Sequence, residues 1–254
     1  MEVSVPMSMF VAFLLATARS AAWLVISPPF SSRVIPPRVK ALLAAALALL
    51  VTPRIAASAP ALEPGPLLGS LVQQVAIGMS LGFLTALLFA AIQAAGDLID
   101  LFGGFSLAFA FDPLMQQGNS VFGRLYGLLA VTLLFASGGH LLILRGFLST
   151  YDALPLDAGL SLGRLGDLLG HGLVTMFVAA LQIAGPLIAV LFLADVGMGL
   201  LTRVAPMLNV FSLAFPAKIL VTLVLVGMSF PLLPSAVNGL AERSVQFMGT
   251  LVGG

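Results

Sequence analysis

Long runs of apolar residues, separated by short polar or proline-rich stretches, limit the folds that this chain can adopt. A helix needs about 20 such residues to cross a bilayer, and in lipid it must pair its own backbone groups. The pattern predicts an all-α integral membrane protein with about six apolar helical segments, several of them kinked or broken. The segments cover residues 7–27, 41–51, 67–95, 121–148, 168–204 and 215–233.

Composition supports this class of protein and excludes others. Only 8% of the residues are charged and the mean hydropathy is +1.14, whereas soluble domains are about 25% charged. The net charge of +1 provides no basic surface for nucleic acid. Cysteine is absent, which excludes disulfides, a thiolate nucleophile and a cysteine metal site. We expect a protein that lies in membrane lipid or in a largely apolar assembly.

Two of the apolar runs have unusual lengths. The second, 41–51, is followed by Thr52 and Pro53 and is too short to span a bilayer unless it extends back through the preceding connector. The third, 67–95, is about 43 Å long as a single helix and exceeds the bilayer core of about 30 Å. It is expected to tilt strongly or to project from the bilayer.

The last two runs are predicted to form a C-terminal helical hairpin. Gly185-Pro186 predicts a kink within the fifth run. Pro206 ends that run, and a short turn that contains Pro206 and Asn209 leads to the sixth run, which opens at Pro216. Two apolar helices joined by a short turn are typical of an antiparallel helix pair.

A glycine- and phenylalanine-rich segment interrupts the helical runs. Bulky and small residues alternate in it with a period of two, which favours an extended or irregular backbone. Gly103 and Gly104 precede it and Asp112-Pro113 follows it, as breakers at both ends. The bulky positions are Phe105, Leu107, Phe109 and Phe111. The alternative is a helix, because Phe102, Phe105 and Phe109 are spaced i, i+3 and i+7.

Irregular backbone cannot face lipid, so this segment is expected to be buried in protein or to border a water-filled path. In a narrow path, apolar side chains close a channel because they make the water column unfavourable. The sequence therefore makes the segment a candidate gate. A loop that only packs against its own helices is the alternative.

Charges within the apolar runs are costly at bilayer depth and need partners. Asp195 lies inside the fifth run, and we expect it to pair with Arg19, Arg203 or Lys218 in a structural role. A functional role as an intramembrane acid is the alternative. Arg19, Asp195 and Lys218 are therefore candidate residues for structure or assembly.

Other polar residues give weaker signals. Asp97 and Asp100 lie on one helical face and could bind a cation or a proton, but we expect them to mark the wet end of the third run. His140 has no second ligand at metal-binding spacing, so no metal site is predicted. Neither a Gly-x-Ser-x-Gly elbow nor a phosphate-binding loop occurs. We expect a protein that is not an enzyme and needs no cofactor.

An ordered set of motifs resembles the FliR family of flagellar export-gate proteins and its relatives in virulence-type type III secretion. No single motif is specific, but their order over nearly the whole chain is. They are Ala18-Arg19, Pro28-Pro29, Pro36-Pro37-Arg38, Gly96, Asp100, Gly103-Gly104, Asp112-Pro113, Phe135, Gly138-Gly139-His140, residues 149–155, Ala205-Pro206, Asn209, Phe211 and Phe215-Pro216-Ala217-Lys218.

The resemblance implies a non-enzymatic subunit of a gate through which unfolded proteins are exported. It implies one such chain per complex, with FliP-like, FliQ-like and FlhB-like subunits, in the bacterial inner membrane at the flagellar basal body. Residues 1–167 resemble FliP and residues 168–254 resemble the FliQ hairpin. The family's channel plug corresponds to about 101–113, which places it on Phe102 to Phe111 here.

Two other functions stay open at this point. A virulence-type secretion homologue would share the same architecture. A small-solute or ion transporter would use Asp195 and broken helices near the middle of the membrane. The chain has neither an internal inverted repeat nor matched broken helices in its two halves, which disfavours the transporter.

Overall fold

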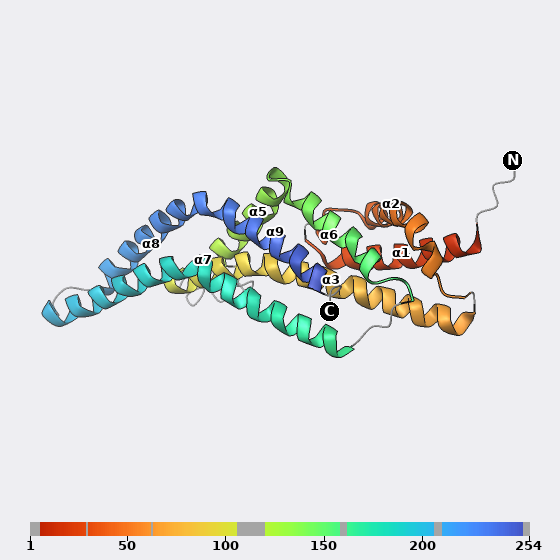
Figure 1. Cartoon of the computed structure of the whole chain (residues 1–254). Coiled ribbons are helices and arrows are strands. Elements are labelled where there is room, and N and C mark those ends of the chain that lie inside the picture. Colours follow the sequence, from red (N-terminus) through yellow and green to blue (C-terminus); the bar gives the residue numbers. More distant parts are fainter. Residues whose placement is uncertain are drawn as a thin grey trace. The chain divides into compact units, whose positions relative to one another are not determined.

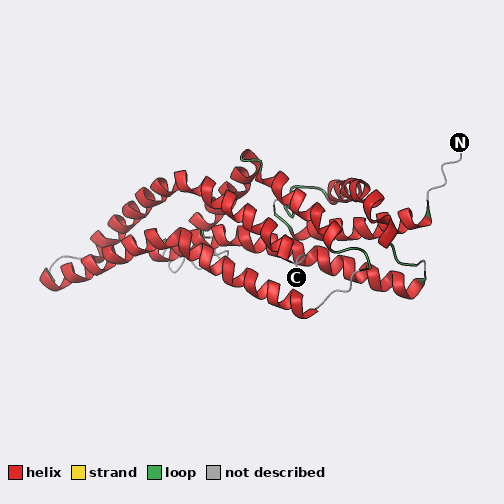
Figure 2. Cartoon of the chain, in the orientation of Figure 1, coloured by secondary structure: helices red, strands yellow, loops and turns green. Residues whose placement is uncertain are grey.

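The computed structural model describes residues 6–28, 30–61, 63–105, 120–157, 162–205 and 210–250. Every regular element in these ranges is a helix (Figure 2). Five helices are long and apolar enough to cross a membrane, or up to six if the bent pair of helices in the middle of the chain counts as one span. The prediction of an all-α membrane protein with about six apolar segments is confirmed.

The first compact unit comprises Met1–Leu88, Gly138–Val174 and Leu240–Gly254. Trp23 lies in its core and stacks on Phe147, with ring centroids 4.3 Å apart. Gly78 lets α3 approach α1 closely, because a Cβ there would lie 2.9 Å from Ala22 Cβ. The helices that lie wholly in this unit are α1 (Met7–Ile26), α2 (Pro37–Ile55), the 3-10 helix η1 (Ala56–Ser58) and α6 (Gly139–Ala153) (Figure 1).

The second compact unit comprises Phe89–Ser137 and Thr175–Gly239. It holds α5 (Val121–Ala136), α8 (Val210–Ser229) and the 3-10 helix η2 (Phe230–Leu232). Tyr126 on α5 and Ser229 share a buried hydrogen bond of 2.6 Å. Three helices have parts in both units: α3 (Pro64–Gly103), α7 (Leu162–Val204) and α9 (Leu233–Thr250).

Helix α2 extends back through the preceding connector, the alternative left open for the second apolar run. It begins at Pro37 and continues through Pro53, so that with η1 it covers 22 residues, enough to cross a membrane. The second apolar run is therefore not too short to span. A proline at the first helical position lacks an N–H that would be unpaired anyway, and it starts the helix well before residue 41. Pro53 lies near the end of α2 and removes only one backbone hydrogen bond there.

Helix α3 is longer than predicted, and the fourth apolar run is two helices rather than one. α3 has 40 residues, a length of about 60 Å, so the expectation of a helix longer than the bilayer core is confirmed. The fourth run breaks at Gly138, whose φ of 76° lies in the left-handed region that glycine adopts readily. The stretch between the predicted fourth and fifth runs, 149–167, is also partly helical, because α6 extends to Ala153 and α7 begins at Leu162.

The C-terminal hairpin is confirmed, with different boundaries. α7 is helical through Pro186, and α8 begins at Val210, so Pro216 lies inside α8 and not in the turn. Pro206 and Asn209 lie outside the described residues. No helix was predicted after residue 233, but Leu233–Thr250 form α9. Because this segment contains polar residues, its hydropathy is too low to stand out as an apolar run. The same helix nevertheless buries four apolar residues, namely Val237, Leu240, Ala241 and Met248.

Candidate functional site

The end of α3 is a backbone break at two glycines. Gly103 is the last residue of α3, and Gly104 follows with a φ of 85°. A residue with a side chain adopts this region at a cost of about 1–2 kcal/mol, because its Cβ approaches the following carbonyl oxygen. The prediction that these glycines end the helix is confirmed.

The candidate gate segment begins at this break. Phe102 belongs to the last turn of α3 and Phe105 to the turn that follows. Their positions agree with a segment that departs from the helix at Gly104. The extended backbone predicted beyond Phe105 stays a prediction, because the remaining residues lie outside the described ranges: Leu107, Phe109, Phe111, Asp112 and Pro113.

Both glycines lie against α8. A Cβ added to Gly103 would lie 2.8 Å from Thr222 Cγ2, closer than real side-chain carbons approach one another. A Cβ on Gly104 would lie 3.6 Å from the Phe215 ring and 3.7 Å from Lys218 Cδ. The chain therefore leaves α3 directly over one face of α8, and glycine at position 103 is required for that approach.

Lys218 on α8 is paired with Asp195 on α7. The Lys218 ammonium lies 2.7 Å from each carboxylate oxygen of Asp195. Among the partners expected for Asp195, the structure thus selects Lys218 rather than Arg19 or Arg203. The side chains of Lys218 and Asp195 are 22% and 47% exposed, so the pair lies at the edge of the protein interior.

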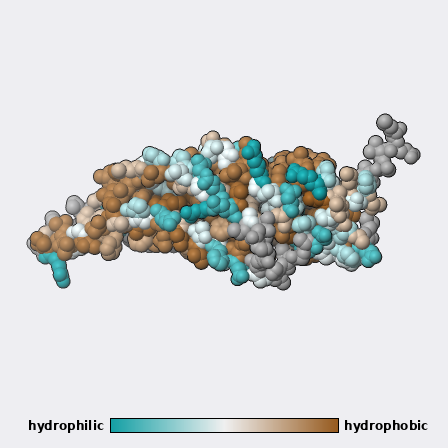
Figure 3. Space-filling model, viewed as in Figure 1, coloured by the Kyte–Doolittle hydropathy of each residue, from teal (hydrophilic) through white to brown (hydrophobic). Residues whose placement is uncertain are grey.

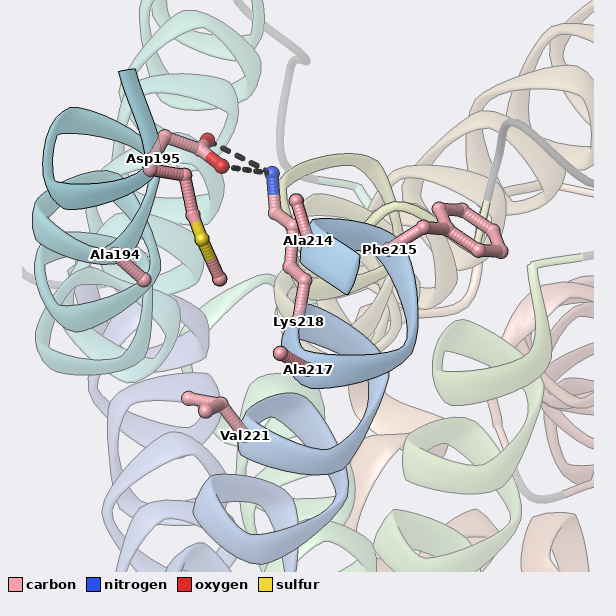
Figure 4. Close-up of a pocket in the computed structure, with 8 residues that line it drawn as sticks. Ala194, Asp195, Ala214, Phe215, Ala217, Lys218 and Val221 are labelled. Carbon is pink, nitrogen blue, oxygen red and sulfur yellow. Dashed lines mark hydrogen bonds and ion pairs between the residues drawn. The ribbon is translucent and has the colours of Figure 1, made fainter. Parts of the chain in front are cut away.

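A cavity of about 210 Å³ separates the two helices at this ion pair. Figure 4 shows Asp195 reaching across it to Lys218, while the Phe215 ring points away from the ion pair. All other lining side chains are apolar: Ala194, Met198, Ala214, Phe215, Ala217 and Val221. Among the described residues that line this cavity, Asp195 and Lys218 are therefore the only charged ones.

A second contact places the start of α5 against the end of α3. Asp100 on α3 is buried, and its Oδ2 accepts a hydrogen bond of 3.2 Å from the Phe122 N–H. The first N–H groups of a helix have no partner within it, and the carboxylate also meets the positive end of the helix dipole. Ser120 completes the cap by accepting from the Gly123 N–H at 2.7 Å. Phe105 packs edge-on against Phe122, with centroids 4.9 Å apart.

The two aspartates of α3 therefore differ. Asp97 is exposed, in agreement with the wet end predicted for this run, but Asp100 is buried, and the prediction is wrong for that residue. Within the described residues no group of three or more His, Asp or Glu side chains could hold a metal ion. Asp100 Oδ2 instead accepts from the Phe122 N–H of α5, while its buried Oδ1 has no hydrogen-bond partner among the described residues.

Arg19 lies in the first unit and is fully buried. Its guanidinium donates to Gln74 Oε1 at 2.6 Å and to the carbonyls of Leu154 at 2.8 Å and Thr150 at 3.4 Å. It also lies 4.3 Å from the ring centroid of Tyr151. Because the two carbonyls belong to the end of α6, the negative end of that helix takes the place of an acidic partner.

The sequence identified most residues at the C-terminal end of α3, but not the residues of α8 and α5 that pack against them. Thr222 was missed, although it follows Lys218 by four residues and so shares its helix face. Ser120 directly precedes an apolar run, which is a signal for a helix N-cap that could have been used. Phe122 has no distinguishing signal among the many apolar residues of its run.

Comparison with known proteins places the chain in a family. The model of bacterial export proteins, family 1, matches residues 10–244. The chain belongs to this family. With five to six apolar helices it is a multi-pass membrane protein, and its family membership makes it a component of a protein export apparatus.

Its relatives come from both flagellar and secretion systems. The flagellar biosynthetic protein FliR of Pectobacterium carotovorum subsp. carotovorum is 33% identical over 223 residues, 85% of this chain and 83% of the relative. FliR of Escherichia coli K12 is 33% identical over 226 residues, with shares of 85% and 82%. The secretion system apparatus protein SsaT of Salmonella typhimurium is 32% identical over 165 residues, 65% of this chain and 64% of SsaT.

Proposed function

We propose that this export protein is a non-enzymatic subunit of the flagellar type III export gate, and that the segment after Gly104 closes the channel for unfolded flagellar proteins. The carrying observation is the break at the end of α3. Gly104 leaves the helix in a left-handed conformation, and Phe105 is already packed on Phe122. The alternating bulky residues of the gate segment follow directly, as Leu107, Phe109 and Phe111.

Such a segment suits a gate for unfolded chains. A closed gate must stop ions and water, and apolar side chains in a narrow path do so without chemistry. An open gate must admit many different sequences, which disfavours specific polar contacts. The glycines at 103 and 104 and the Asp112-Pro113 pair would define the two ends of the moving part.

The proposed partners are FliP-like, FliQ-like and FlhB-like subunits in the bacterial inner membrane, with one copy of this chain per complex. Residues 1–167 would take the FliP-like place and 168–254 the FliQ-like place. Exposed apolar side chains support assembly or lipid contact: only 28% of the α7 span and 22% of the span from Ala214 to Gly249 are buried. Figure 3 shows apolar surface over α8 and the adjoining part of α7.

The flagellar system is favoured over a virulence system by coverage. The two FliR relatives match 85% of the chain, whereas SsaT matches 65%. The ion pair disfavours the transporter alternative, because Asp195 is neutralised by Lys218 and is not a free intramembrane acid. Expression in a flagellar strain that lacks its own FliR should restore swimming. Restored needle secretion without swimming would favour the virulence system.

The gate is tested by truncating its bulky side chains in the assembled complex. Phe109→Ala with Phe111→Ala should leave assembly unchanged and raise small-ion leak across the membrane. The matched control is Phe177→Ala with Phe192→Ala, which removes two exposed rings of α7 and should not raise leak. If the Phe109/Phe111 double variant assembles normally and the membrane stays tight to ions, the gate is contradicted. The segment would then only pack against other helices, or a partner subunit would make the seal.

A further inference from the structure

We infer that Asp195 and Lys218 are positioning residues for the end of α3: together they fix the face of α8 on which Gly103 and Gly104 rest. Any effect of this positioning on ion leak through the complex rests on the proposed function. The positioning itself concerns only described residues and can be measured without it. No feature of the sequence alone connects Asp195 with the glycines, which lie far from it along the chain.

A single side chain connects the three helices. Lys218 Cδ would lie 3.7 Å from a Cβ at Gly104, so its aliphatic stem lines the site of the break. Its ammonium lies 2.7 Å from both Asp195 oxygens on α7. The Lys218 stem thus lies beside Gly104, directly after α3. Its ammonium is held on α7 by Asp195 (Figure 4).

Removing the Asp195 charge should displace this side chain. The ammonium would stand beside a cavity whose other walls are apolar, and an unpaired charge in such surroundings is costly. The helix or the side chain would shift until the ammonium reached water or a lipid headgroup. The stem would then leave the position beside Gly104.

The displacement would also reach Gly103. Thr222 lies one turn beyond Lys218 on the same face of α8 and donates to the Lys218 carbonyl at 2.8 Å. It is fully buried, with Gly103 directly against it. Because a Cβ at Gly103 would lie only 2.8 Å from Thr222 Cγ2, the two helices are in contact and a small rotation of α8 separates them measurably.

The absence of native cysteine allows a direct measurement. We would place cysteines with Gly103→Cys and Thr222→Cys and follow disulfide formation under mild oxidation in the assembled complex. The Cβ positions are 3.4 Å apart, close to the 3.5–4.5 Å that disulfides require. Rapid cross-linking is expected. Absence of cross-linking in this parent would overturn the contact and the inference with it.

The ion pair is then changed in this parent. Asp195→Asn or Lys218→Met alone leaves one unpaired charge and should slow cross-linking severalfold. The pair Asp195→Asn/Lys218→Met leaves no unpaired charge, so it should assemble and give an intermediate rate. If the single variants do not assemble, the double variant decides. Cross-linking as fast as in the parent would overturn the inference.

The matched control is the exposed ion pair of Arg54 and Asp152, in which Arg54 Nη1 lies 3.6 Å from Asp152 Oδ2. Asp152→Asn removes the same charge type and should leave the cross-linking rate unchanged. A slower rate in this control would mean that any loss of charge has the effect, and it too would overturn the inference.

Leak measured on the same complexes separates the inference from the proposed function. Slower cross-linking with higher leak supports both. Slower cross-linking with a tight membrane supports the positioning role and contradicts the gate. Unchanged cross-linking overturns the positioning role whatever the leak.

Discussion

At the scale of single residues, two glycines and one arginine carry constraints that no other residue type meets. Gly103 has no room for a Cβ, and Gly104 has a left-handed backbone with ordinary contact distances around it. Arg19 serves one amide and two carbonyls at once. For each constraint we expect a substitution to destabilise the protein more than the same kind of substitution at a control residue.

Gly103→Ala is expected to weaken the packing of α3 on α8 because the new methyl meets Thr222. Thr222→Ala removes the clashing atoms and leaves its own Cβ 3.4 Å away, so the double variant should recover much of the loss. The control is Gly185→Ala, where a Cβ meets nothing within 4 Å. The measurement is the thermal stability of the purified complex. A double variant no better than Gly103→Ala would contradict the contact.

Arg19→Met should destabilise the protein by about 3 kcal/mol, because Gln74 and the end of α6 lose a charged donor in the interior. Arg19→Lys should recover only part, since one ammonium cannot reproduce the planar fork of the guanidinium. Arg54→Met is the control, because Arg54 is exposed and forms only a long ion pair. Equal losses in denaturation midpoint for Arg19→Met and Arg54→Met would contradict this account.

At the scale of elements, the start of α5 depends on a residue of another helix. The start of α5 is held by Asp100 of α3 and by Ser120 next to it. Phe122, which lies in that first turn, is also the residue against which Phe105 packs. The cap of α5 and the start of the proposed gate segment are therefore one structural feature.

Asp100→Ala should lower stability by about 1–2 kcal/mol, because it leaves a buried N–H at the start of α5 without its acceptor. In the proposed gate it should also raise leak, since Phe105 would lose a fixed support. Asp152→Ala is the control: it removes an exposed carboxylate of α6. Chemical denaturation and ion leak of the two variants check this. Indistinguishable variants would show that Asp100 is not a cap.

At the scale of the whole molecule, much apolar surface of α7 and α8 is uncovered within the chain. The exposed side chains of α7 include Phe192 and Leu193, at 57% and 66%. Large exposed apolar surfaces mark contact with lipid or with other proteins. A chain of this kind is expected to be stable only in a membrane and in company with partner subunits.

Leu193→Lys should lower the yield of the assembled complex several-fold, because a charge at this depth costs about 3 kcal/mol whether lipid or a partner helix lies there. Val34→Lys is the control, since Val34 is 89% exposed and lies in the connector between α1 and α2. Co-purification of tagged chain with its partner subunits is the readout. Equal yields for both variants would place Leu193 in water.

The sequence by itself determined the class of fold and the family. Long apolar runs leave a chain no alternative to helices in lipid, because only helices pair all of their backbone groups locally. The break at Gly103-Gly104 was also predictable, since glycine pairs end helices through a local property of the backbone. These predictions depend on neighbours along the chain, and they are confirmed by α1, α3 and the C-terminal hairpin.

Only the tertiary structure decided which partners the charged residues found. Asp195 had three candidate partners in the sequence, and its choice of Lys218 depends on how α7 and α8 pack. Asp100 was placed at a wet end, but it is buried, and the start of α5, which lies next to it only after folding, donates one hydrogen bond to it. The ends of α2 and α8 were misjudged for the same reason, because packing stabilises helices beyond prolines that local rules treat as boundaries.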